Sequence, residues 1–260
     1  MTTAAAPRHT QFSRVLALTT TELQLLLRNK TVAVSSILLP LALGLFWAYS
    51  FPAGEDLRMQ AMVVTLQLIV VVGMGVYVTA TTTLVARRHA RVLKRMRTSG
   101  ISDRGLLTAT LAPTVVLALG QLVVFAVINT VSGVPLPVEP LWLVVAIAGG
   151  FALALTAALA TAVVTPSPER AQITTLPFTF VVLGAAAVVP LVPADGVLQA
   201  LVAVPGAAVG TLVQAAYTGE MWGGDAFGIP AVVFPLLALS VWAQVFVWFA
   251  RKRFRWDPRH

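Results

Sequence analysis

Charged residues are scarce in this 260-residue chain. Asp, Glu, Lys and Arg together make up 11% of it, whereas soluble domains carry about 25%. Apolar residues account for 58% of the chain. So few charges cannot cover the water-facing surface of a protein of this size, and we therefore expect most of the chain to face lipid.

Cysteine is absent, and histidine is limited to His9, His89 and His260. Disulfides, thiolate nucleophiles and cysteine-bound metals are thereby excluded, and without an H-E-x-x-H motif we predict no metal site. The phosphate-binding motif G-x-x-x-x-G-K-[ST] is also missing, so the chain is not expected to bind ATP through a P-loop. No Ser–His or paired-carboxylate arrangement stands out either. We therefore predict no catalytic residues, no cofactor in this chain and no enzymatic activity of its own.

Long apolar runs dominate the rest of the sequence. A membrane-crossing helix needs about 20 mostly apolar residues, and six stretches qualify: 32–51, 61–86, 106–131, 141–165, 173–192 and 229–250. None contains Asp, Glu, Lys, Arg or His. The sequence therefore predicts an all-α membrane protein with six transmembrane helices in a single domain, 1–260. Because gradient-driven carriers usually keep ionisable groups within the membrane, uphill transport by this chain would need energy from another molecule.

The basic residues indicate the orientation. With six spans and both ends on one side, 17 of the 18 Lys and Arg residues fall on that side, and only Arg58 falls on the other. Loops on the cytoplasmic side are rich in Lys and Arg, so we predict a multi-pass protein with both termini cytoplasmic. The same bias explains the net charge of +8 without nucleic-acid binding. The high Ala, Val and Arg content suits a GC-rich bacterium, and we therefore expect the bacterial inner membrane.

Two further hydrophobic segments do not count as spans. The segment 193–228 contains an apolar run. If this run were a seventh span, the basic C-terminal tail would lie outside, against the charge bias. We therefore expect the segment 193–228 to be re-entrant from the outside or to lie in the outer interface. Residues 10–28 space their apolar side chains roughly along one helical face, which predicts an amphipathic helix on the inner membrane surface. The alternative for 10–28 is a disordered tail that leads into the first span.

The segment 87–104 gathers seven basic residues between the second and third spans. On a helix, Arg87, Arg88, Arg91, Lys94 and Arg95 share one face, while His89, Val92, Leu93 and Met96 share another. Such a helix, with an apolar ridge and a charged flank, suits docking into a groove of another protein. The alternative is a loop in contact with water or lipid headgroups.

The string LKRMRTSGIS, Leu93–Ser102, resembles the signature of type-2 ABC exporter permeases, and so does the layout of the whole chain. The resemblance implies that 87–104 is a coupling segment that docks on a pair of cytoplasmic P-loop ATPase subunits, which would bind ATP and magnesium. It also implies a second permease copy or a related permease. The docking helix would comprise Arg88, Arg91, Val92, Leu93, Lys94, Arg95, Met96, Arg97 and Thr98. The chain departs from the family pattern where Arg87 and His89 replace two acids, Arg91 a small glycine and Gly100 a proline.

Mildly polar side chains occur inside the predicted spans: Gln67, Thr79, Thr82, Gln121, Asn129 and Thr179. Hydrogen bonds between helices are their ordinary role; the alternative is that some line a substrate path. An uncharged path would suit hydrophobic or amphipathic cargo, such as a drug or lipid-like molecule. A membrane anchor without transport and a gradient-driven secondary carrier remain the alternatives to an ATP-driven exporter.

Overall fold

The computed structural model describes residues 34–51, 54, 56–89, 103–192, 196–225 and 228–253, together with 19–21, 23–25, 28 and 30. Within these residues, every element of regular secondary structure longer than one residue is a helix. Two are π-helices (η1, Val34–Leu38, and η2, Val71–Val78), and η3, Gly196–Ala203, is a 3-10 helix. The α-helices are α3 (Leu39–Ser50), α4 (Leu57–Val70), α5 (Thr79–His89), α7 (Asp103–Val131), α8 (Pro140–Val164), α9 (Pro168–Val188), α10 (Pro205–Thr218) and α11 (Val233–Arg253).

Five helices are long and apolar enough to cross a membrane: Leu57–His89, Gly105–Val131, Pro140–Val164, Pro168–Val188 and Val233–Arg253. Their bounds differ by a few residues from the predicted spans 61–86, 106–131, 141–165, 173–192 and 229–250. The predicted first span, 32–51, is represented by the shorter apolar helix Ser36–Ser50, and residues 31–33 lie outside the described part. The part of the chain that the structure describes is thus all-helical, with five helices capable of crossing a membrane, and the sixth span stays a prediction.

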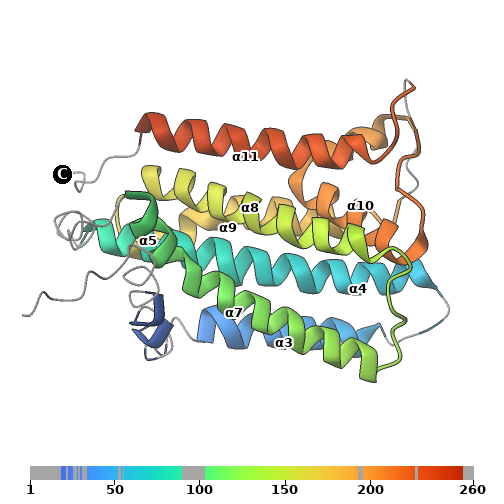
Figure 1. Ribbon diagram of the computed structural model, residues 1–260, viewed down its shortest axis with the longest axis horizontal. Helices are drawn as coiled ribbons and strands as arrows, with labels where there is room; N and C mark the ends of the chain where they lie inside the picture. Colours follow the sequence, from blue (N-terminus) through green and yellow to red (C-terminus); the bar gives the residue numbers. More distant parts are fainter. Residues whose placement is uncertain are drawn as a thin grey trace, which may run out of the picture.

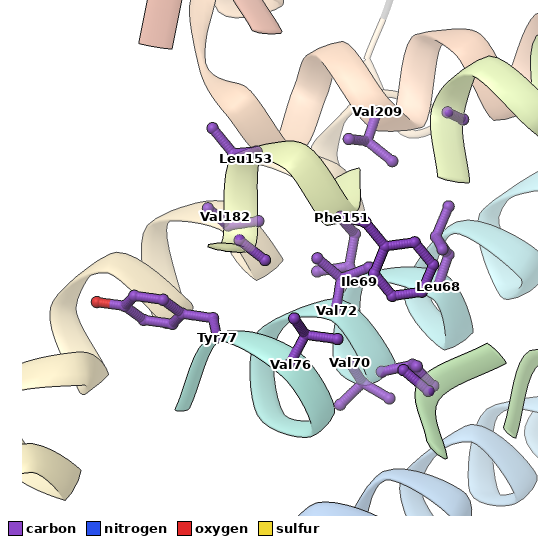
Figure 2. Close-up of a cluster of buried hydrophobic side chains, with 14 of the residues drawn as sticks. Leu68, Ile69, Val70, Val72, Val76, Tyr77, Phe151, Leu153, Val182 and Val209 are labelled. Atoms are coloured by element: carbon purple, nitrogen blue, oxygen red, sulfur yellow. The ribbon is translucent and has the colours of Figure 1, made fainter. Parts of the chain in front are cut away.

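The span formed by α4, η2 and α5 is the centre of the bundle (Figure 1). Its most apolar window is 89% buried within the protein, against 17–44% for the other four long helices. Figure 2 shows why: side chains of this span, including Leu68 and Val72, meet Phe151 of α8, Val182 of α9 and Val209 of α10. Lipid-facing surface is therefore supplied by the outer helices.

The predicted segment 193–228 folds largely as η3 followed by α10, and α10 lies inside the bundle. Every residue from Pro205 to Tyr217 is buried. At its start, a Cβ on Gly206 would lie 1.8 Å from the carbonyl oxygen of Val182, so only glycine permits this approach to the backbone of α9. Just before it, the indole N–H of Trp242 in α11 donates to the Ala203 carbonyl (2.8 Å).

The hairpin of η3 and α10 leaves the bundle at the end where it came in. Gln199 of η3 donates to the Gly223 carbonyl beyond α10 (3.0 Å), and Trp222 donates to the Val192 carbonyl before η3 (3.1 Å). The end of α10 meets the start of α8 where Glu139 N–H donates to the Ala216 carbonyl (3.0 Å). The position of this hairpin relative to the membrane stays a prediction.

Charges separate to the two ends of the bundle. The C-terminal ends of α5, α8 and α11 lie together on the left in Figure 1; α5 and α11 end in Arg87–His89 and Arg251–Arg253. Of the described acids, Asp56 and Glu139 precede α4 and α8, and Glu220 and Asp225 follow α10, at the opposite end. Arg58 lies there too, in an exposed ion pair with Glu220 (3.8 Å). Asp103 and Glu169 begin α7 and α9 at the same end as Arg87–His89. We call the two ends the basic end and the acidic end.

Of the predicted amphipathic helix 10–28, residues 19–21, 23–25 and 28 are helical. The remaining residues of that prediction lie outside the described part of the chain, so its interfacial position stays a prediction.

Candidate functional site

Arg88 lies in the last turn of α5, at the basic end, and is turned into the protein. Its side chain is only 5% exposed. Nη1 donates to the Ala162 carbonyl (2.7 Å), and Nη2 donates to the Thr165 carbonyl. Both acceptors lie at the C-terminus of α8, where backbone carbonyls lack partners within the helix and a cation is favoured by the helix dipole. Arg88 therefore attaches the end of α5 to the end of α8.

The other predicted docking residues lie outside the described residues: Arg91, Val92, Leu93, Lys94, Arg95, Met96, Arg97 and Thr98. Their role on a partner surface stays a prediction. Of the flanking residues that the structure describes, α5 ends at His89 and α7 begins at Asp103, both at the basic end.

Gln67 of α4 and Asn129 of α7 form a buried reciprocal amide pair. Gln67 Nε2 donates to Asn129 Oδ1 (3.1 Å), and Asn129 Nδ2 donates to Gln67 Oε1 (2.7 Å). Gln67 Nε2 also donates to the Gly44 carbonyl of α3 (3.3 Å). The pair joins three helices of the bundle, as expected for polar groups between membrane helices.

The same two amides line a pocket of about 160 Å³ between α4, α7, α8 and α10, next to the α7–α8 connection at the acidic end. Its walls are mainly apolar, with Leu68, Phe125 and Leu143 among them, and Tyr217 of α10 completes them. Among the described residues, no charged side chain lines it. The pocket can hold an uncharged, largely apolar group with amides at one side.

The remaining polar candidates do not line this pocket. Gln121 Nε2 donates to the Ser36 carbonyl (2.7 Å), which joins α7 to η1, while Gln121 Oε1 is buried without a hydrogen-bond partner. Thr79, Thr82 and Thr179 each donate to a carbonyl of their own helical segment, at 2.9–3.0 Å. The structure thus brings together Gln67 and Asn129 and leaves these four apart from them.

A comparison with known protein families identifies the family of this chain. Residues 17–252 match the family model described as ABC-2 family transporter protein. The chain belongs to this ABC-2 transporter family. The resemblance seen in Leu93–Ser102 is thereby confirmed at the level of the family. No curated protein and no solved structure matches the chain.

Membership of the ABC-2 family makes this chain a multi-pass membrane permease. The matched region is a membrane domain without an ATPase domain of its own, and the family implies association with an ABC ATPase. Within the described residues there is no group of three or more His, Cys, Asp or Glu that could hold a metal ion.

Three features of this ABC-2 permease escaped the sequence analysis. Tyr77 of η2 shares a hydrogen bond with Thr161 of α8 (2.9 Å between the hydroxyl oxygens). Tyr217 lines the pocket, and the inward turn of Arg88 onto α8 was not foreseen. Tyr77 could have been noticed as the one tyrosine of its span, but its partner lies 84 residues away in sequence and no local pattern names it.

Proposed function

We propose that this chain is the membrane-spanning permease subunit of an ATP-driven ABC exporter for hydrophobic or amphipathic compounds, drug or lipid-like. The observation that carries the proposal is the ABC-2 family match over residues 17–252. It favours a transporter over a membrane anchor. The absence of ionisable residues from the predicted spans favours ATP over an ion gradient as the energy source.

The proposed orientation puts the basic end in the cytoplasm of a bacterium and the acidic end outside its inner membrane. The separation of charges in the fold supports this, since Arg87–His89 and Arg251–Arg253 end helices at one pole and Asp56 and Glu139 lie at the other. Ser36–Ser50, extended by its preceding residues, would be the sixth span. Both termini would then be cytoplasmic, and α10 would be re-entrant from outside.

Energy would reach the permease through the segment 87–104. A pair of cytoplasmic P-loop ATPase subunits would bind ATP and magnesium and close on each other, and the segment would move with them. Its apolar ridge, Val92, Leu93 and Met96, would insert into a groove of the ATPase, with Arg91, Lys94 and Arg95 on the charged flank. A second permease copy or a related permease would complete the assembly.

The cargo would pass the pocket that Gln67 and Asn129 line. Because no charged side chain of the described residues faces this pocket, a charged molecule would lose its hydration there without compensation. An apolar or amphipathic molecule loses far less and gains contacts with the apolar wall. This reasoning supports hydrophobic cargo and a path at the interface of α4, α7, α8 and α10.

The test is co-purification of the tagged full-length chain with the ATPase from its natural host. Replacing Leu93 and Met96 together by Asp places two carboxylates in the apolar ridge and is expected to abolish recovery of the ATPase. The matched control, Leu93→Met with Met96→Leu, keeps the ridge apolar and should retain it. Full recovery of the ATPase with the Asp variant would refute the docking proposal.

A further inference from the structure

Arg88 belongs to the predicted docking helix by sequence, but in the fold its guanidinium lies against α8 rather than at the surface. We propose that Arg88 is a positioning residue: it locks the cytoplasmic end of α5 to the C-terminus of α8, so that a displacement of segment 90–102 moves both helices together. The proposal rests on the proposed coupling to an ATPase and names the residue through which the movement enters the bundle.

The first argument is the burial of a permanent charge. Arginine is seldom buried this completely unless it is paired, and its guanidinium cannot give up its proton to avoid the cost. Here two of its nitrogens donate to the carbonyls of Ala162 and Thr165. Hydrogen bonds to a charged donor are about twice as strong as those between neutral groups. Pulling α5 away from α8 would break these two charge-assisted hydrogen bonds and take the donor away from both carbonyls.

The second argument is that the same end of α8 is held twice. Tyr77, eleven residues before Arg88 in the same continuous helix, shares its hydroxyl hydrogen bond with Thr161. Thr161 and Ala162 lie in the last turn of α8, and Thr165 is the residue that caps it. Tyr77 and Arg88 thus both form hydrogen bonds to the C-terminal end of α8. Two such contacts oppose both sliding and rotation of α5 against α8.

The third argument concerns the helices that pack against α8. It packs against α11 and α10 as well as against α5, and the end of α10 is bonded to the start of α8 through Glu139 and Ala216. A shift of α8 at the basic end therefore displaces the partners of the buried hairpin at the acidic end. Packed helices transmit such shifts because their interfaces do not deform continuously.

The test uses the absence of cysteine, which allows one spin label per chain without further changes. The label is attached to Glu220→Cys, an exposed side chain just beyond α10, in the full permease–ATPase complex in lipid vesicles. With Arg88 present, we expect the label's spectrum or inter-copy distance to change between the nucleotide-free and ATP–vanadate-trapped states.

The variants Arg88→Ala and Arg88→Lys are compared with the control Arg170→Ala, which removes an exposed cation at the same end of the bundle. Arg88→Ala is expected to keep the ATPase bound but to lose the nucleotide-dependent change. Arg88→Lys, which retains the charge but not the two-pronged donor, should recover part of it, and Arg170→Ala should leave it intact. A merely stabilising role would lower the unfolding temperature without altering the response of the folded complex.

An unaltered response in Arg88→Ala, or in Arg88→Lys if the alanine variant does not fold, overturns the inference. Failure of the proposed function looks different, because the unsubstituted chain would then not retain the ATPase and no variant would show a nucleotide-dependent change.

Discussion

Replacing Gly206 by alanine should separate α10 from α9. The added Cβ would lie 1.8 Å from the Val182 carbonyl oxygen and 2.6 Å from its carbon, whereas ordinary contact begins near 3.4 Å. The two backbones must therefore move apart by about 1.6 Å. Since the obstacle is backbone rather than a flexible side chain, we expect a cost near the upper end of the usual overpacking range, about 3 kcal/mol.

The assay is thermal unfolding of the purified chain in detergent, followed by the loss of its monodisperse chromatographic peak. Gly206→Ala should lower the midpoint by several degrees. The matched control is Gly184→Ala in α9, where the added methyl group meets nothing within 4 Å. Its unfolding midpoint should equal that of the unsubstituted chain. Equal midpoints for the two variants would refute the close packing of α10 on α9.

Two further predictions concern the polar pair and the orientation. Gln67→Leu and Asn129→Leu should each destabilise the protein, and the double variant should cost less than their sum by about 1 kcal/mol, as expected for two hydrogen bonds within a membrane; additivity in the same unfolding assay would argue against the pair. In the cysteine-free chain, Ser132→Cys at the acidic end should react with an impermeant maleimide added to intact cells. Glu169→Cys at the basic end should react only after the membrane is opened, and the reverse pattern would invert the proposed topology.

The long helices could be predicted because their signal is local. Each is an uninterrupted apolar run bounded by charges or by turn residues, as where Glu139 and Pro140 begin α8 and Arg251–Arg253 end α11. The first run, 32–51, is described only from Val34 onward, as η1 and α3, so its span stays a prediction. Family membership could also be predicted from the sequence, because Leu93–Ser102 keeps the spacing of basic and apolar residues seen in the family signature.

What the sequence could not show depends on contacts between distant residues. Arg88 reads as one more cation of a basic segment, and only the fold brings the end of α8, 74 and 77 residues away, against its guanidinium. Gln67 and Asn129 could be named as polar residues in spans, but not as partners. The spacing of Gly206 and Gly210 is compatible with a packing face of small residues, but it does not identify Val182 of α9 as the backbone that Gly206 meets.

The most direct test of the account is a photo-crosslinking amino acid placed at Leu93 of the full-length chain in its natural host. The account predicts a nucleotide-sensitive crosslink to a P-loop ATPase, identified by mass spectrometry, and none from the same amino acid at Ser132 in the acidic end. A crosslink from Leu93 to lipid or to no protein, with the ATPase still bound to the complex, would contradict the claim that this segment receives the ATPase's movement.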